Sequence, residues 1–186
     1  MRALFVLLSL FSLFACSEND DMDVRLCFVG DSMVANWDVE RSFPNRITEN
    51  RGRDGIGISE LSELSSIGDG KDVVVLIGTN DIGATMSEQE VAIYVDGYLK
   101  AVADLGGKRV FLLSVLPTAD LDKNRRIECF NEQVAAKVSV SSKFVYINCY
   151  ETFLQDEVLR EDLSRDGTHL NDYGYVLLSD KLKEKL

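Results

Sequence analysis

The sequence contains a single histidine, His169, among its 186 residues. Any reaction that needs an imidazole as general base therefore has only this residue to supply it. Basic residues are also in the minority, because 20 Lys and Arg stand against 31 Asp and Glu, for a formal net charge of −11. Such a surface argues against nucleic acid or an anionic membrane as the partner. The chain has no internal repeat, low-complexity segment or domain linker, which indicates one domain.

The one long apolar run, near the N-terminus, is too short to span a bilayer and has the length of a signal peptide. It ends at Ala15-Cys16, where the sequence turns polar, and this junction resembles a bacterial lipobox. There Cys16 would be acylated and become the new N-terminus; an ordinary signal peptide with a chance cysteine is the alternative. We expect a signal peptide over 1–15, a lipoprotein tether over 16–23 and the folded domain over 24–186. The predicted location is the bacterial cell envelope, with membrane contact only through the lipid anchor.

Three further cysteines are present, at Cys27, Cys129 and Cys149. Since three is odd, at least one thiol stays free or pairs between chains. Cys27 lies in an apolar, strand-like run, which favours a buried and inert thiol.

Short apolar runs alternate with longer amphipathic segments along the chain. Strand-like runs cover 24–29, 72–77, 109–114 and 143–147, and a weaker one lies near 47–50. Helical periodicity covers 87–105, 122–140 and 171–186, and shorter helices are expected after Ser59 and Tyr150. Strands separated by helices form parallel sheets with right-handed crossovers. The pattern predicts an α/β fold, a flavodoxin-like three-layer α/β/α sandwich around a central parallel sheet of about five strands.

The first candidate for chemistry is Ser32, which ends Gly30-Asp31-Ser32 directly after the first strand. A serine at a strand-to-helix turn presents its hydroxyl above the sheet, beside the amides of a helix N-terminus. The alternative is a plain turn in which Ser32 or Asp31 caps a helix. Position 34 is not glycine, which excludes the Gly-x-Ser-x-Gly elbow of α/β-hydrolases.

Two loops could supply oxyanion donors. The glycines of residues 50–57 do not have the spacing of a dinucleotide-binding fingerprint. This segment is either a flexible loop or a loop that points a glycine amide, best that of Gly55, into a site. Residues 78–81 follow the strongest strand; there Asn80 can offer its side-chain amide to an oxyanion and Asp81 could brace the loop. An Asx-turn that closes the strand is the alternative.

The last candidates are Asp166 and His169, at the start of the final helix. Three residues separate the carboxylate from the imidazole, so one turn can place both near the same point. Asp166 could then accept from one ring nitrogen, which leaves the other to take a proton from Ser32. The alternative is a surface histidine beside a capping aspartate.

Together these segments resemble the SGNH hydrolases, the GDSL-like esterase and lipase family. The four matching blocks occur in the family's order, at 30–32, 50–55, 78–81 and 166–169, and the resemblance extends over nearly all of the mature chain.

The resemblance implies that Ser32 is the nucleophile, His169 the base and Asp166 its orienter. The oxyanion hole would consist of the backbone amides of Ser32 and Gly55 and the side chain of Asn80. In the second block, Arg53-Asp54 is larger and more charged than is usual in the family, which leaves the choice between Gly52 and Gly55 open.

We therefore expect a secreted, lipid-anchored serine esterase that cleaves carboxylic esters through an acyl-enzyme, without metal or cofactor. Short acyl groups such as acetyl on carbohydrates are the favoured substrates, because the short chain has no evident lid insertion and no long apolar loop near the motifs. Lipid-directed esterases, thioesterases and acyltransferases of the same family remain alternatives. So do a glycan-binding surface lipoprotein and a non-catalytic flavodoxin-like module, in which Asp31 and Asp81 would be structural or bind a cation.

Overall fold

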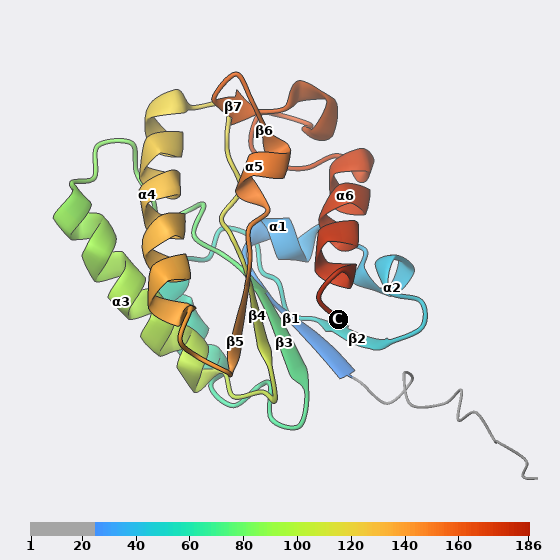
Figure 1. Ribbon diagram of the computed structural model, residues 1–186. Coiled ribbons are helices and arrows are strands. Elements are labelled where there is room, and N and C mark those ends of the chain that lie inside the picture. The colour runs from blue at the N-terminus through green and yellow to red at the C-terminus, as the bar shows by residue number, and fades with distance from the viewer. Residues whose placement is uncertain (1–24) are drawn as a thin grey trace, which may run out of the picture.

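A five-stranded parallel sheet forms the centre of the protein (Figure 1). This computed structural model describes residues 25–186; the expected signal peptide, tether and lipidation site at Cys16 lie outside the described residues. The strands are β1 (Arg25–Gly30), β2 (Ile47–Asn50), β3 (Asp72–Leu76), β4 (Val110–Leu113) and β5 (Phe144–Ile147). They lie in the order β2-β1-β3-β4-β5, and each neighbouring pair is parallel. Both the five-stranded sheet and its flavodoxin-like order agree with the predicted fold.

The central strands β1, β3 and β4 are apolar except for Arg25 and Asp72 at their starts, because helices cover both faces of the sheet. In β3 all five residues are buried. Val73 and Val75 belong to one hydrophobic cluster, whereas Val74 and Leu76 belong to the cluster on the opposite face. This alternation follows from the two-residue period of a strand.

One face of the sheet packs against α3 (Glu88–Asp104), α4 (Leu121–Val138) and the 3-10 helix η2 (Ile58–Leu64). The other face packs against α1 (Ser32–Ala35), α2 (Val39–Ser42) and α6 (Asp172–Lys183). In Figure 1 these two groups of helices stand on opposite sides of the sheet. The three-layer α/β/α arrangement is therefore confirmed. The remaining elements are α5 (Tyr150–Phe153), β6 (Leu154–Gln155), β7 (Val158–Leu159) and η3 (Glu161–Leu163).

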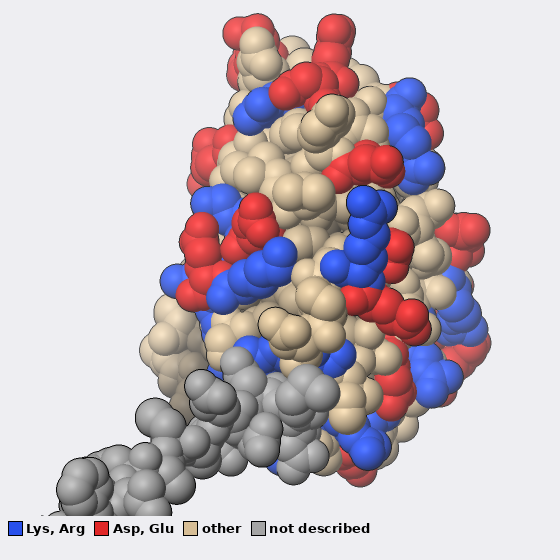
Figure 2. Space-filling view, turned by 90° about the vertical axis from the view of Figure 1, so that its right-hand side faces the viewer, with Lys and Arg blue, Asp and Glu red and all other residues tan. Residues whose placement is uncertain are grey.

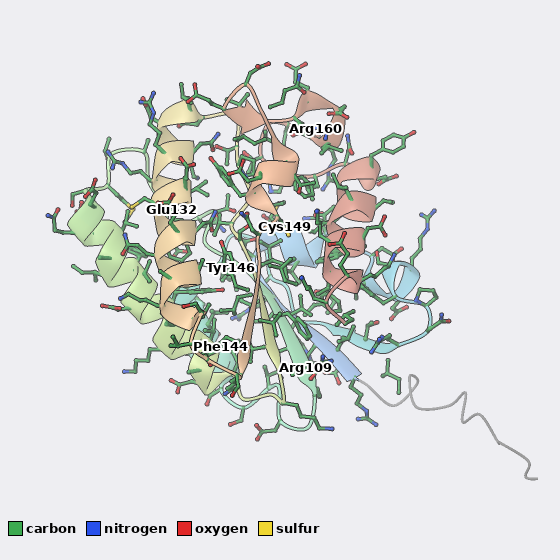
Figure 3. All side chains as sticks on the ribbon, viewed as in Figure 1. Arg109, Glu132, Phe144, Tyr146, Cys149 and Arg160 are labelled. Carbon is green, nitrogen blue, oxygen red and sulfur yellow. The ribbon has the colours of Figure 1, made fainter. Side chains whose placement is uncertain are left out.

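The edge strand β5 shows the same two-sided packing in a less buried form. Phe144 and Tyr146, labelled in Figure 3, pack against the cluster beneath α3 and α4. Val145 and Ile147 face the opposite cluster, which also contains Cys149 at the start of α5. The edge strand β5 thus contributes side chains to both hydrophobic clusters and ends at the carboxyl edge of the sheet.

The predicted helices are present with small changes at their ends. A capping box begins α3, since Ser87 Oγ accepts from the Glu90 amide and Glu90 Oε2 accepts from the Ser87 amide. The segment near Ser59 is a 3-10 helix. Tyr94 lies at the margin of the buried face of α3, where the helix borders a groove, and is 40% exposed.

Figure 2 shows the face that carries α2 and α6, where acidic and basic side chains are interspersed. Within residues 25–186, no helix is both long enough and apolar enough to cross a membrane.

Candidate active site

Ser32 lies at the carboxyl edge of the sheet, where β1 turns into α1. The turn is formed by Asp31, the N-cap of α1, whose Oδ1 accepts a hydrogen bond from the Met33 amide at 2.9 Å. The chain therefore reverses direction immediately before Ser32 and leaves its hydroxyl partly exposed above the sheet. Capping by Asp31 was one of the two expected interpretations, and it coexists here with a serine placed for chemistry.

The three residues expected to act together are in contact, although 137 positions separate Ser32 from His169. Ser32 Oγ lies 2.9 Å from His169 Nε2, and His169 Nδ1 lies 2.8 Å from Asp166 Oδ2. If Nδ1 carries the hydrogen that faces the carboxylate, Nε2 is left as the acceptor for the serine hydroxyl. This chain of hydrogen bonds is the geometry that a serine nucleophile with an imidazole base requires.

Backbone hydrogen bonds hold Asp166 in its charged form. The amide of His169 donates to Oδ1 at 2.8 Å, and the amide of Thr168 donates to the same oxygen at 3.0 Å. The His169 amide, the imidazole and the Thr168 amide, in that order, lower the pKa of Asp166 to about 2. These hydrogen bonds and the 54% exposure of its side chain both favour the carboxylate, so Asp166 is ionised at neutral pH.

The main chain around His169 is also fixed. The amide of Arg165 donates to the His169 carbonyl at 2.9 Å, and Ser164 Oγ donates to the same carbonyl at 3.2 Å. A short antiparallel bridge pairs Ser164 with Leu170. The loop before α6 is therefore a closed turn that presents the imidazole to Ser32.

The two glycines left open by the sequence have different surroundings. The amide of Gly52 donates to Asn50 Oδ1 at 2.9 Å, and a Cβ at Gly52 would lie 2.2 Å from the Ala35 nitrogen. Gly52 thus packs closely against α1, and its amide already has a hydrogen-bond partner. Gly55 has φ +74°, open space where a Cβ would project, and no backbone hydrogen bond from its amide within residues 25–186. Of the two amides, that of Gly55 is the one left available to a ligand.

Asn80 lies beside Gly55 at the edge of the same pocket. Its Nδ2 donates to the Ile56 carbonyl at 2.9 Å, and because an amide nitrogen carries two hydrogens, the second remains for a ligand. The next residue, Asp81, accepts from the Ile58 amide through Oδ1 at 2.9 Å. The loop after β3 is in this way fastened to the loop after β2, so Asp81 braces its loop as expected.

A residue whose role sequence reasoning missed is Asn50, at the end of β2. Its Nδ2 donates to the carbonyls of Val34 and Trp37 at 2.8 and 3.0 Å, while its Oδ1 accepts from Gly52. Asn50 therefore attaches the glycine loop to α1, which carries the serine. The only sequence signal was a polar side chain at the carboxyl end of a strand.

Asp31 is the second residue whose role went beyond expectation. It is 1% exposed, and its Oδ2 is buried without a hydrogen-bond partner in the described part of the chain. Burial raises the pKa of Asp31 from the usual 3.8 to about 6, and the hydrogen bond from Met33 opposes this rise only in part. An ionisable group thus lies directly beneath the serine.

These residues surround an open pocket of ≈ 520 Å³. It is lined by Ser32, Asn36, Asp54, Gly55, Asn80, Arg165, Asp166 and His169. None of the eight has an apolar side chain, so polar side chains, charged side chains and glycine backbone form the pocket wall.

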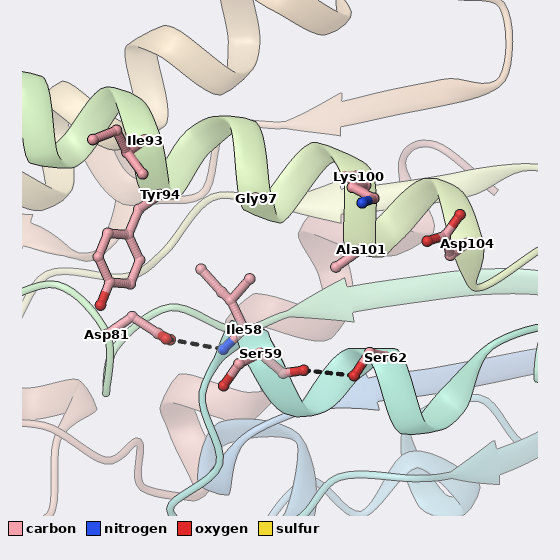
Figure 4. Close-up of a pocket in the computed structure, with 10 residues that line it drawn as sticks. All are labelled: Ile58, Ser59, Ser62, Asp81, Ile93, Tyr94, Gly97, Lys100, Ala101 and Asp104. Atoms are coloured by element: carbon pink, nitrogen blue, oxygen red, sulfur yellow. Dashed lines mark hydrogen bonds between the residues drawn. The ribbon is translucent and has the colours of Figure 1, made fainter.

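A second, more apolar pocket of ≈ 450 Å³ lies between η2 and α3 (Figure 4). Tyr94 and Asp81 stand near one end of it, and Lys100 and Asp104 near the other. Ile58 and Ala101 contribute to its apolar wall. Asp81 adjoins Asn80 in sequence, which brings one end of this groove close to the loop that carries the amide donor.

The remaining reactive groups do not form a further centre. Among residues 25–186 no cluster of His, Cys, Asp and Glu has the arrangement of a metal site. Cys27, Cys129 and Cys149 are all free. Cys27 is fully buried and burial raises the pKa of its thiol, in agreement with the inert thiol expected there.

Comparison with known proteins agrees with this architecture. The profile of the GDSL-like Lipase/Acylhydrolase family matches residues 28–177. A member of the lipolytic protein G-D-S-L family from Veillonella parvula superposes with a TM-score of 0.69 at 21% identity, over 88% of this chain and 98% of that chain. A GDSL-like lipase from Bacteroides thetaiotaomicron gives 0.66 at 23% identity over 87% of each chain. A lipase/acylhydrolase from Enterococcus faecalis gives 0.65 at 21% identity over 87% of this chain and 94% of that chain. A comparison with curated proteins gives no match.

Proposed function

This chain belongs to the GDSL-like lipase/acylhydrolase family and is a carboxylic ester hydrolase, and on that premise we propose that it removes short acyl groups from carbohydrates through Ser32, His169 and Asp166. The proposal has two parts, the mechanism and the substrate class. The distances within the site support the first, and the composition of the pocket wall supports the second.

In the first half of the reaction, Ser32 Oγ attacks the carbonyl carbon of the ester while His169 Nε2 takes the hydroxyl proton. Asp166 keeps the imidazole oriented and stabilises the imidazolium that forms. The carbonyl oxygen becomes an oxyanion, which accepts hydrogen bonds from the amides of Ser32 and Gly55 and from the side chain of Asn80. The C–O bond to the alcohol then breaks, and His169 returns the proton to the departing oxygen.

In the second half, water replaces the alcohol. His169 takes a proton from the water as it attacks the acyl carbon, and the same three donors stabilise the second oxyanion. The bond to Ser32 Oγ breaks, the imidazolium returns the proton to this oxygen, and the free carboxylic acid leaves. His169 alone carries out every proton transfer in this mechanism, which is consistent with a sequence that contains a single histidine.

The observation that carries the substrate class is the absence of apolar side chains among the eight residues that line the pocket. A long acyl chain bound there would gain little from burial, because hydrophobic stabilisation is proportional to the apolar area removed from water. A small acyl group and a hydroxyl-rich alcohol match polar walls that offer both donors and acceptors.

A fluorophosphonate probe tests the mechanism, because it should label the wild-type protein and fail to label Ser32→Ala. Ser32→Ala and His169→Ala should each lower kcat on a short acyl ester by ~10³-fold or more, and the double variant should be little worse. Additive losses would reject a shared serine–histidine mechanism. Retained glycan binding without any turnover by the wild-type protein would favour a binding module instead.

The apolar groove between η2 and α3 favours one second candidate, an esterase for longer acyl chains. Gly97 lines this groove, and a Cβ there would meet nothing within 4 Å, so a larger side chain can begin there and Gly97→Leu should occupy part of the groove. A series of p-nitrophenyl esters separates the candidates. We expect activity to fall as the acyl chain lengthens, equally in both proteins. A preference for long chains that Gly97→Leu abolishes would establish the second candidate.

For location, we propose that Cys16 carries a lipid anchor in the bacterial cell envelope. The support is the short apolar run that ends in a small residue before this cysteine. Labelled palmitate should be incorporated by the full-length protein and not by Cys16→Ala. Mature protein that begins beyond Cys16 and carries no lipid would exclude the anchor and leave the esterase proposal intact.

A further inference from the structure

Two charged side chains in the polar pocket have no part in the proposed ester chemistry. They are Asp54, on the loop after β2, and Arg165, on the loop before α6. Neither forms an ion pair with another residue of the range 25–186. Both nevertheless line the pocket that contains Ser32 and His169. In contrast, the neighbouring Arg53 is paired with Glu63 outside the pocket at 2.9 Å.

Asp54 and Arg165 come from different loops but line the same pocket, together with Ser32 and His169. Tyr175 of α6 lies in their electrostatic field, and its hydroxyl donates to the Met33 carbonyl at 2.9 Å. Burial raises the pKa of Tyr175 to about 12; the Arg165 guanidinium opposes the rise, and the Asp54 carboxylate adds to it. Asn36, the C-cap of α1, adds a polar side chain to the same pocket wall.

We propose that Asp54 and Arg165 form the subsite for the leaving alcohol and bind two hydroxyl groups of a neutral sugar next to its ester. This inference rests on the proposed function and specifies its substrate. A hydroxyl group both donates and accepts. A carboxylate can therefore accept from one hydroxyl while a guanidinium donates to its neighbour.

The opposite charges of the pair decide between neutral and charged alcohols. A sugar acid would be attracted by Arg165 but repelled by Asp54, and a cationic alcohol would meet the reverse arrangement. A neutral polyol gains a charge-assisted hydrogen bond from each residue without either repulsion.

The test compares three acetyl esters. They are a neutral methyl glycoside monoacetate with a free hydroxyl on each neighbouring carbon, its analogue without those hydroxyls, and p-nitrophenyl acetate. The variants are Asp54→Ala and Arg165→Ala. Asp96→Ala and Arg125→Ala are matched controls, since these residues are exposed on α3 and α4 and are absent from the pocket. Thermal unfolding of each variant shows whether the fold is retained.

We expect wild-type kcat/KM to be ~10-fold or more higher for the hydroxylated sugar ester than for its deoxy analogue. Asp54→Ala and Arg165→Ala should each reduce that ratio to near one, and the two controls should leave it unchanged. A loss that is equal for the sugar ester and p-nitrophenyl acetate would overturn the subsite, because it would indicate a general effect on the site.

Two further outcomes would also reject the subsite. One is a wild-type preference for an acetylated uronic acid that only Arg165→Ala removes, which would indicate an anionic substrate. The other is cleavage of p-nitrophenyl acetate but of no sugar ester, which would reject the carbohydrate part of the proposed function as well. In either case, fluorophosphonate labelling of Ser32 would show separately that the serine mechanism stands.

Discussion

Replacement of Asp31 by Asn should make stability less dependent on pH. The carboxyl group is buried beneath the serine, and its Oδ2 has no hydrogen-bond partner in the described residues. Burial raises its pKa from 3.8 to about 6. The unfolded chain therefore loses this proton at lower pH than the folded protein does. The free energy of unfolding therefore falls as pH rises from about 4 to 6, and the loss is complete above the pKa of Asp31 in the folded protein. Asn keeps an oxygen for the Met33 amide and cannot ionise.

The magnitude follows from the shift of about two pKa units. Each unit corresponds to about 1.4 kcal/mol, so the ionised carboxylate costs the folded state about 3 kcal/mol at pH 8. At pH 4 most of this penalty is absent, because Asp31 is protonated in the folded protein. Between pH 4 and pH 8, the free energy of unfolding of the wild type should therefore fall by about 2–3 kcal/mol relative to that of Asp31→Asn.

Urea unfolding followed by circular dichroism at several pH values measures this difference. Any constant effect of the new amide cancels, since only the change with pH is compared. Asp96→Asn, on the exposed surface of α3, is the control and should follow the wild type throughout. A difference between Asp31→Asn and wild type that is the same at pH 4 and pH 8 would refute the assignment of a raised pKa to Asp31.

Steady-state kinetics and thermal unfolding test three more features of the site. Asn80→Ala should lower kcat by ~10²–10³ with little change in KM, because one oxyanion donor is lost; an effect confined to KM would make Asn80 a substrate-binding residue. Gly55→Ala should keep the amide and cost about 1–2 kcal/mol of stability through its left-handed φ. Gly52→Ala should lose much more stability, because its Cβ would clash with the backbone of α1; a smaller loss than at Gly55 would contradict this packing. Asp166→Asn should lower kcat by ~10³-fold or more while His169 stays near Ser32, and near-normal turnover would exclude Asp166 as the orienting group.

Much of the fold could be predicted because its elements have strong and regular patterns. The central strand β3 is an unbroken apolar run after Asp72, and α3 combines a capping box with a continuous buried face. The hairpin of β6 and β7 could not be predicted in the same way. Its strands have two residues each, and its turn places Asp156 and Glu157 at positive φ, where glycine or asparagine is the usual signal.

The sequence could predict those parts of the candidate site whose residues follow neighbouring strands, because the sheet alone brings such residues together. Ser32 and Asn80 follow neighbouring parallel strands, so the sheet brings them to one edge whatever their side chains do. The choice between Gly52 and Gly55 depends on which way a backbone amide points. That direction is set by the contacts of Asn50 with α1, and no local pattern in the sequence reports them.

The ties between loops explain how donors from separate segments could act as one oxyanion hole. Asn50 fastens the glycine loop to α1, and Asp81 fastens the loop after β3 to the Ile58 amide. The Asn80 side chain adds a third tie through the Ile56 carbonyl. Donors held in this way need little rearrangement when negative charge develops, which is the condition for strong electrostatic stabilisation of a transition state. The pocket itself can therefore stay open and polar, since the loops behind it, and not a closing lid, fix the geometry.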